Sequence, residues 1–184
     1  MTQQAYPGMT DCSTEFFLFE KELKVIQNGN VKSFTELPFN TIQILSEAID
    51  ADLTTKLALH DMHPISQTKR LEQFAICRFG GLDFQGDINN GELQDGEYWP
   101  CSKHGNCDHE GVLCKLPCVN GNRLTKKEVH LMQLTSTDKT NDVIAEEMNL
   151  CFGTFHQIKK FLYEKLCVQT KQEVSIIAKS INLI

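Results

Sequence analysis

The fold of the C-terminal part is decided by residues 124–168, which read LTKKEVHLMQLTSTDKTNDVIAEEMNLCFGTFHQIKKFLYEKLCV. Near the start of this stretch, Thr125 and Glu128 have the spacing of a capping box. In such a box each side chain accepts a hydrogen bond from the backbone amide of the other residue. A helix is therefore predicted to begin here and to end near residues 135–138.

The residues that follow meet the requirements of a helix-turn-helix. Thr140 can cap a second helix over residues 141–148. Ala145 is the small residue where two helices can cross, and Asn149 tolerates the left-handed backbone that the turn needs. A third helix follows, and its predicted buried stripe consists of Leu150, Phe155, Ile158 and Leu162.

The opposite face of the third helix is polar and cationic. Such side chains can hydrogen-bond to base edges or pair with phosphates, so this helix is predicted to read DNA. We expect Thr140 and Asn141, at the start of the second helix, to contact phosphates. The complete set of expected DNA contacts is Thr140, Asn141, Thr154, His156, Gln157, Lys159, Lys160 and Lys165. On spacing alone, four short packed helices with a solvated charged face are an equal alternative.

Residues 124–168 resemble, without a gap, the C-terminal DNA-binding domain of LuxR-type (GerE-like) transcriptional regulators. The residues on that family's signature positions are Leu124, Thr125, Glu128, Thr140, Asn141, Ile144, Ala145, Gly153, Thr154, Lys165, Leu166 and Val168. The tail from residue 170 to 184 looks like the family's fourth helix, which packs the bundle and often mediates dimerisation. The resemblance implies a transcriptional regulator that binds double-stranded DNA as a homodimer.

Several positions depart from the family's pattern. Cys151, followed by Phe152, stands where the family usually has serine at the cap of the reading helix, and Cys167 replaces a glycine. His156 and Ile158 replace a common lysine and histidine, so the DNA sequence preference does not carry over. The alternative function is a protein-interaction module whose degenerate helix-turn-helix contacts RNA polymerase or another regulator.

Composition and charge agree with a globular protein in which only the C-terminal part meets a polyanion. The chain has 184 residues, 41% hydrophobic and 23% charged, with a net charge of -6. Residues 1–119 carry nine basic and seventeen acidic groups (net -8), and residues 120–184 carry nine and seven (net +2). With no hydrophobic leader or membrane-length run in the sequence, we expect a cytoplasmic bacterial protein.

A second informative stretch is CSKHGNCDHEGVLCKLPC, residues 101–118, which holds four cysteines and two histidines. In a reducing compartment, clustered cysteines more often hold metal than form disulfides. Gly105 and Gly111 allow tight turns that would direct successive thiolates toward one centre.

A metal site needs four ligands, and the preferred set is Cys77, Cys101, Cys107 and Cys114. Cys118, His104 and His109 are possible replacements. The unequal spacings fit a structural zinc ion but leave open an iron–sulfur cluster, which would make the protein a redox sensor.

The N-terminal part is predicted to be helical. Phe16, Phe19, Leu23 and Ile26 recur at helical spacing, and residues 28–30 would end that helix. Three more helices are predicted: one after Pro38 with Phe39, Leu45 and Ile49 facing inward, one around Leu53 and Leu57, and one capped by Ser66 and ended by Gly80 and Gly81. Cys77 would lie near the end of the last helix.

A small hairpin is possible within residues 82–100, and residues 119–122 are expected to be a linker.

Two stretches, RLEQFAICRFGGLD and EYWPCSKHGNCDHEGVLCK, look like the N-terminal part of small LuxR-like regulators of Bacteroides-type bacteria and their mobile elements. Asp83, Asp87 and Glu92 do not fit a calcium loop and are interpreted as solvated surface. The sequence also lacks the motifs of zinc hydrolases, zinc deaminases and phosphate-binding loops, so no catalytic residues are predicted.

The predicted fold is mainly α. It comprises a helical N-terminal domain, residues 1–119, with a cysteine-rich metal-binding loop at 77–118, and a four-helix LuxR-like helix-turn-helix domain, residues 120–184.

Overall fold

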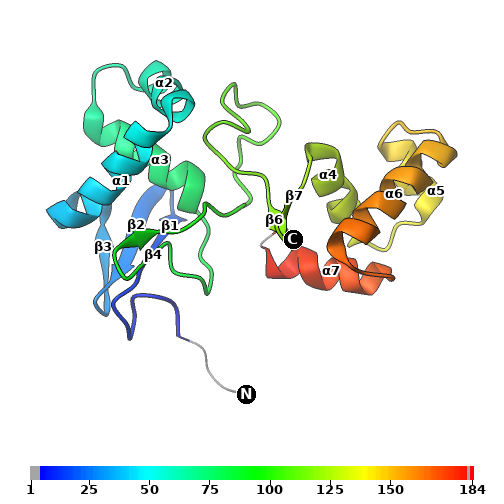
Figure 1. Cartoon of the computed structure of the whole chain (residues 1–184), viewed down its shortest axis with the longest axis horizontal. Coiled ribbons are helices and arrows are strands. Elements are labelled where there is room, and N and C mark those ends of the chain that lie inside the picture. Colours follow the sequence, from blue (N-terminus) through cyan, green and yellow to red (C-terminus); the bar gives the residue numbers. More distant parts are fainter. Residues whose placement is uncertain (1–4, 182) are drawn as a thin grey trace. The chain divides into compact units, whose positions relative to one another are not determined.

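The computed structural model describes residues 5–181, 183 and 184. The chain divides into two compact units, residues 1–115 and residues 116–184. Figure 1 shows helices and strands in the first unit, and a short hairpin followed by helices in the second.

The first unit contains an antiparallel sheet with strands of unequal length. In the described residues it has five strands in the order β3-β2-β1-β4-β5. The strands are β1 (Thr14–Phe19), β2 (Glu22–Gln27), β3 (Asn30–Ser33), β4 (Ile88–Asn89) and β5 (Glu92–Leu93). The hairpin expected within residues 82–100 is confirmed as β4 and β5, and it joins the sheet because Ile88 pairs with Thr14.

The helix predicted over residues 16–26 is wrong, because this segment forms β1 and β2. Glu20 and Lys21 have φ values of 50° and 68°, and Asn28 and Gly29 have φ values of 53° and 75°. Each pair forms a two-residue turn with the left-handed backbone that suits a twisted hairpin. Asn28-Gly29 is thus a hairpin turn rather than a helix stop. The mainly α prediction fails for this unit, which combines a sheet with helices.

Three α-helices follow where the sequence predicts them: α1 (Phe39–Ala51), α2 (Leu53–Met62) and α3 (Gln67–Phe79). A short 3-10 helix, η1 (Phe34–Glu36), precedes them. The Ser66 hydroxyl accepts a hydrogen bond from the Lys69 amide at 3.3 Å, which confirms the predicted cap of α3. Leu45 and Ile49 are buried as expected, but Phe39, the first residue of α1, is 80% exposed, so its predicted inward orientation is wrong.

The core of the first unit lies between the sheet and these helices. Phe16 and Val25 of the sheet are fully buried, and the Phe16 ring lies 6.1 Å from the Phe79 ring of α3. The buried cluster also contains Leu23, Leu45, Leu59, Leu71, Phe74 and Ala75. Burial of one such large apolar side chain contributes about 1.5–3 kcal/mol, so this packing holds α3 against the sheet.

The second unit begins with a hairpin instead of the expected linker. Its strands are β6 (Cys118–Val119) and β7 (Asn122–Arg123), and Asn120 and Gly121 between them have φ values of 51° and 74°. An Asn-Gly pair favours such a two-residue turn. The Asn120 side-chain amide donates to the Leu166 carbonyl at 3.2 Å, which attaches the hairpin to the helices of this unit.

The helices of the second unit are α4 (Lys126–Thr135), α5 (Asn141–Glu147), α6 (Phe152–Leu166) and α7 (Lys171–Ser180). The capping box of α4 is confirmed, since the Glu128 amide donates to the Thr125 hydroxyl at 3.2 Å and the Thr125 amide to the Glu128 carboxylate at 2.7 Å. The most deeply buried side chains are Leu131, Met132, Ile144, Phe155, Leu162, Val174 and Ala178. The four-helix prediction for this part is therefore correct.

Candidate nucleic-acid interface and cysteine cavity

A tight turn joins α5 to α6. Asn149 has a φ of 53°, which confirms the left-handed conformation predicted for it. The Asn149 amide donates to the Glu146 carbonyl and the Leu150 amide to the Ala145 carbonyl, both at 2.9 Å. Ala145 is 4% exposed. A small buried residue followed by a left-handed turn is the geometry that two helices of a helix-turn-helix require.

The outer face of α6 carries the predicted reading residues. Thr154, His156, Gln157 and Lys160 are exposed, whereas Phe155 and Leu162 are fully buried on the opposite face. The Lys160 ammonium lies 3.8 Å from the Glu164 carboxylate, and the Lys160 side chain is 73% exposed. An ion pair this exposed contributes little, so the ammonium is available to another anion.

Lys159 lies at the edge of that face and is half-buried. Its ammonium donates to the Asn141 side-chain oxygen at 3.3 Å and lies 5.1 Å from the centre of the Tyr163 ring. Burial, and secondly the nearby Lys171 ammonium, lower the pKa of Lys159. Lys159 therefore links α6 to the first residue of α5. Thr140 stands at the N-cap position of α5 and is exposed, but its hydroxyl makes no cap hydrogen bond to any described residue, so the predicted side-chain cap is wrong.

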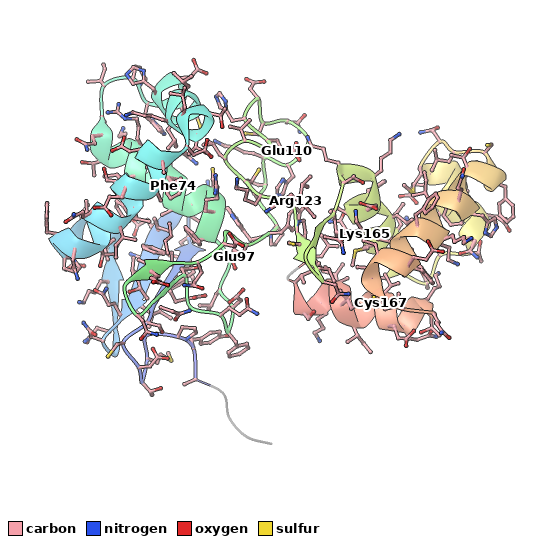
Figure 2. All side chains as sticks on the ribbon, in the orientation of Figure 1. Phe74, Glu97, Glu110, Arg123, Lys165 and Cys167 are labelled. Carbon is pink, nitrogen blue, oxygen red and sulfur yellow. The ribbon has the colours of Figure 1, made fainter. Side chains whose placement is uncertain are left out.

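Lys165 has a different environment from the other predicted contacts. Its ammonium donates to both carboxylate oxygens of Glu128, at 2.9 and 3.1 Å, and to the Arg123 carbonyl at 3.0 Å. Lys165 and Arg123 are labelled in Figure 2. An ammonium has three protons to donate. All three N–H groups of the Lys165 ammonium therefore have acceptors within the second unit.

The start and end of α6 show the effects of the departures from the LuxR pattern. Cys151 makes no side-chain cap hydrogen bond to the described residues, although its sulfur lies 3.0 Å from the Thr154 hydroxyl. Phe152 is 51% exposed, and its ring meets the His156 ring edge-on at 4.2 Å. Cys167 has a φ of 57°, a conformation for which glycine is better suited.

The four predicted metal ligands line one cavity of about 330 Å³ in the first unit: Cys77, Cys101, Cys107 and Cys114. Burial, with a smaller contribution from the other three cysteines, raises the pKa of the Cys77 thiol to about 11. The Gln73 side-chain amide donates to the Cys77 sulfur at 3.2 Å. Cys118 lies exposed on β6 in the second unit.

The loop around this cavity consists of two similar turns. The Cys101 carbonyl accepts a hydrogen bond from the His104 amide, and the Cys107 carbonyl one from the Glu110 amide, each at 3.1 Å. Gly105 and Gly111 follow with φ values of 83° and 87°, which confirms the predicted glycine turns. The signal in the sequence that could have shown this repeat is a cysteine followed four residues later by a glycine, twice in succession.

Both histidines of the loop bind other groups. The His104 ring has one nitrogen 3.0 Å from the Trp99 carbonyl and the other 3.5 Å from the Glu110 carboxylate. His109 lies 3.1 Å from the Asp61 carboxylate. His104, His109 and Glu110 line the same cavity as the four cysteines.

Arg78 of α3 attaches the cysteine loop to the helical layer. Its guanidinium donates to the Leu113 carbonyl, next to Cys114, and to the Thr55 hydroxyl at 3.1 Å. Because Cys77 precedes Arg78 on the same helix, this contact brings Cys77 and Cys114 to the same cavity. In the described part of the chain, no three His, Cys, Asp or Glu side chains are grouped closely enough to hold a metal ion, so metal binding stays a prediction.

Comparison with known families agrees with the geometry of the second unit. Residues 122–178 match the family of bacterial regulatory proteins called the luxR family. These residues run from β7 to α7, so the chain carries a LuxR-family helix-turn-helix domain at its C-terminal side. No curated protein and no solved structure matches the chain. Among the described residues, no helix has the length and apolar character needed to span a bilayer.

Proposed function

We propose that the protein is a sequence-specific DNA-binding transcriptional regulator that inserts α6 into the major groove. The observation that carries this proposal is the outer face of α6, where Thr154, His156, Gln157 and Lys160 are all exposed beside a family-matched helix-turn-helix. Hydroxyl, imidazole and amide groups can hydrogen-bond base edges, and an ammonium pairs with phosphate. Since one such domain reads one half-site, the expected active form is a homodimer.

The remaining contacts are divided between DNA binding and support. Thr140 and Asn141 are proposed to contact the phosphate backbone, with Lys159 holding the Asn141 side chain in place through the 3.3 Å hydrogen bond. Lys165 is proposed to support the fold, because DNA could engage its ammonium only by displacing Glu128.

The test is the salt dependence of binding to duplex DNA. For the native chain, the logarithm of the association constant should fall linearly with the logarithm of salt concentration as counterions are released. Lys160→Glu should weaken binding and lower the slope by about one unit or more. Lys69→Glu, the same charge reversal at an exposed position in the first unit, is the matched control. Equal salt slopes for the native protein and Lys160→Glu would refute the proposal that α6 contacts DNA.

A protein-interaction module is the second candidate, and the exposure of Phe152 favours it. An exposed aromatic side chain next to His156 suits a protein contact such as RNA polymerase. Phe152→Ala separates the two candidates. If the protein binds DNA through α6, the variant should keep the native salt slope of DNA binding. If it is an interaction module, the native chain should show no salt-dependent DNA binding, and the variant should lose binding to the protein partner.

We further propose that Cys77, Cys101, Cys107 and Cys114 bind one structural zinc ion. The support is that all four line the same cavity, and that His104 and His109, which line it too, have polar partners of their own. Four thiolates close the coordination shell of zinc and stabilise a small loop-rich region. Elemental analysis with an absorption spectrum tests the assignment. One zinc per colourless chain supports it, and iron with visible absorption would establish an iron–sulfur redox sensor instead.

A further inference from the structure

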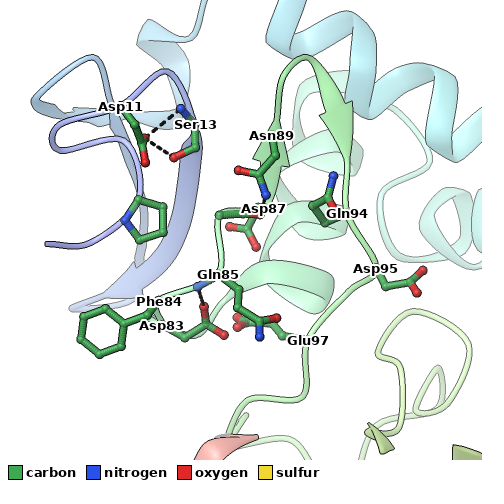
Figure 3. A pocket seen from close by; sticks show the side chains of 12 residues that line it. Asp11, Ser13, Asp83, Phe84, Gln85, Asp87, Asn89, Gln94, Asp95 and Glu97 are labelled. Atoms are coloured by element: carbon green, nitrogen blue, oxygen red, sulfur yellow. Dashed lines mark hydrogen bonds between the residues drawn. The ribbon is translucent and has the colours of Figure 1, made fainter. Parts of the chain in front are cut away.

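The first unit is a poor partner for the phosphates of DNA. Residues 1–119 have a net charge of -8, and Asp83, Asp87 and Glu97 line one cavity of about 360 Å³ (Figure 3). Asp87 is 5% exposed, so its interpretation as solvated surface is wrong. Glu15 on β1 is also buried, and it accepts a hydrogen bond from the Asp83 amide at 2.9 Å. An excess of negative charge repels phosphates, so contacts with bases are expected from α6 in the second unit.

One row of exposed side chains along α6 changes from aromatic to cationic. Phe152, His156 and Lys160 follow each other at intervals of four residues, so they lie on the same side of the helix. Phe152 is 51% exposed, and His156 and Lys160 are exposed as well. The Lys160 ammonium suits a phosphate, whereas the Phe152 ring carries no charge and cannot pair with one. An uncharged ring at the start of a reading helix is suited to the bases themselves.

The rings of Phe152 and His156 hold each other in place. Their centres are 4.2 Å apart and their planes are inclined by 82°, which is an edge-on contact. Phe155, which is fully buried, lies 6.4 Å from the Phe152 ring and 5.5 Å from the His156 ring. Both exposed rings therefore rest on a side chain of the core. Groups that are already held in place lose little conformational freedom on binding, so contacts made through them are favourable.

The distance between these two rings suits two neighbouring base pairs. Successive bases of one DNA strand are about 3.4 Å apart along the helix axis, and the two ring centres are 4.2 Å apart. In the major groove, thymine presents an apolar C5-methyl group that a phenylalanine ring can contact, and a purine presents N7 as an acceptor. An imidazole N–H can donate to that N7.

Gly153 leaves room for DNA to approach next to the Phe152 ring. A Cβ atom added there would meet no described heavy atom within 4 Å, apart from its chain neighbours and the backbone of its own helix. Gly153 is also not one of the described glycines with positive φ. The fold thus has no need of glycine at this point, and glycine inside a helix is less favourable than alanine. Close approach of another molecule to the helix backbone does require a residue without a side chain.

We propose that Phe152 recognises a thymine in the major groove through its C5-methyl group, and that His156 donates to N7 of a purine in the neighbouring base pair. This inference rests on the proposed DNA binding by α6. It makes Phe152 a specificity-determining residue of the reading helix. Because both purines carry N7, His156 distinguishes purine from pyrimidine, whereas Phe152 supplies the preference for thymine.

The first experiment selects duplexes from a random-sequence library with the full-length protein. The native chain should enrich thymine at one position of each half-site. Phe152→Ala should lose this preference but keep the native salt slope, because the contact with the methyl group is not ionic. Phe39→Ala makes the same change at a residue of the first unit that is 80% exposed, and it should enrich the same sequences as the native chain.

The second experiment replaces the enriched thymine by uracil, which lacks only the methyl group. The affinity of the native chain should fall about fourfold, the effect of exposing one apolar carbon atom. Phe152→Ala should bind the thymine and uracil duplexes equally. Gly153→Ala should bind the thymine duplex roughly tenfold more weakly, as much as one mismatched base pair costs, because its Cβ atom keeps the DNA away from the ring.

These measurements separate failure of the inference from failure of the proposed function. Equal affinity of the native chain for the thymine and uracil duplexes would overturn the role of Phe152, and native affinity of Gly153→Ala would overturn the close approach beside it. In both cases the proposed function stands if binding weakens with salt. A native chain that enriches no sequence and binds no duplex in a salt-dependent way would overturn both, and Phe152 would then belong to a surface for a protein partner.

Discussion

The ammonium of Lys165 lies 2.9 Å from the carboxylate of Glu128, so the last turn of α6 is attached to the first turn of α4. Glu128 is also the second half of the capping box with Thr125. The Glu128 carboxylate therefore accepts hydrogen bonds both from the Thr125 amide at the start of α4 and from the Lys165 ammonium at the end of α6. A lysine on a family signature position has a structural partner in this chain.

Lys165→Met should lower the free energy of unfolding by about 1–2 kcal/mol, because Glu128 is 13% exposed and loses its charged partner. Chemical denaturation measures this change. The variant should keep the native salt slope of DNA binding. Lys160→Met provides the contrast, with native stability and a lower slope. A reduced slope for Lys165→Met would show that DNA displaces Glu128.

Cys167→Gly should raise the free energy of unfolding by about 1 kcal/mol. The φ of 57° at Cys167 is unfavourable for a residue with a Cβ atom, and glycine removes that cost. Cys167→Ala controls for loss of the thiol and should bring no gain, since the Cβ atom remains. If alanine stabilises the protein as much as glycine, the sulfur rather than the backbone is responsible.

Cys114→Ser should abolish stoichiometric zinc binding and lower the unfolding midpoint of the first unit. A hydroxyl does not replace a thiolate on zinc, and metal binding stabilises the folded loop. Cys118→Ser makes the same change at an exposed cysteine outside the cavity and should retain one zinc per chain. Metal analysis of both purified variants decides the point. Loss of zinc from Cys118→Ser would place Cys118 among the ligands.

Acidification below about pH 4 should remove the contribution of the α2 cap. The Thr54 hydroxyl, followed by the Thr55 hydroxyl and amide, lowers the pKa of Asp52 from its usual value. A carboxyl group whose pKa is lower in the folded state stabilises the protein above its unfolded pKa, and this contribution is lost as the pH falls through the folded value. Asp52→Ala should therefore cost about 1 kcal/mol at pH 7 and progressively less at lower pH. Denaturation curves from pH 2 to pH 7 measure this difference, and a cost independent of pH would contradict the ionised cap.

The C-terminal unit could be predicted closely because its determinants are local. A capping box at Thr125 and Glu128, an alanine at 145 and an asparagine at 149 are each interpretable within a few residues. The N-terminal strands were missed although one of their signals is local. Their aromatic and aliphatic residues fit a helical spacing as well as a strand, and the Asn28-Gly29 turn between β2 and β3 was interpreted as a helix stop.

By itself, the sequence determined the caps of α3 and α4, the glycine turns of the cysteine loop and the helix-turn-helix, because short-range hydrogen bonds and backbone preferences produce them. Tertiary structure alone decided that Lys165 binds Glu128, that Cys77 joins three cysteines of a later loop, and that Glu15 meets Asp83 and Asp87. Each of these contacts joins residues that are far apart in the sequence, so it depends on which helices, strands and loops pack together.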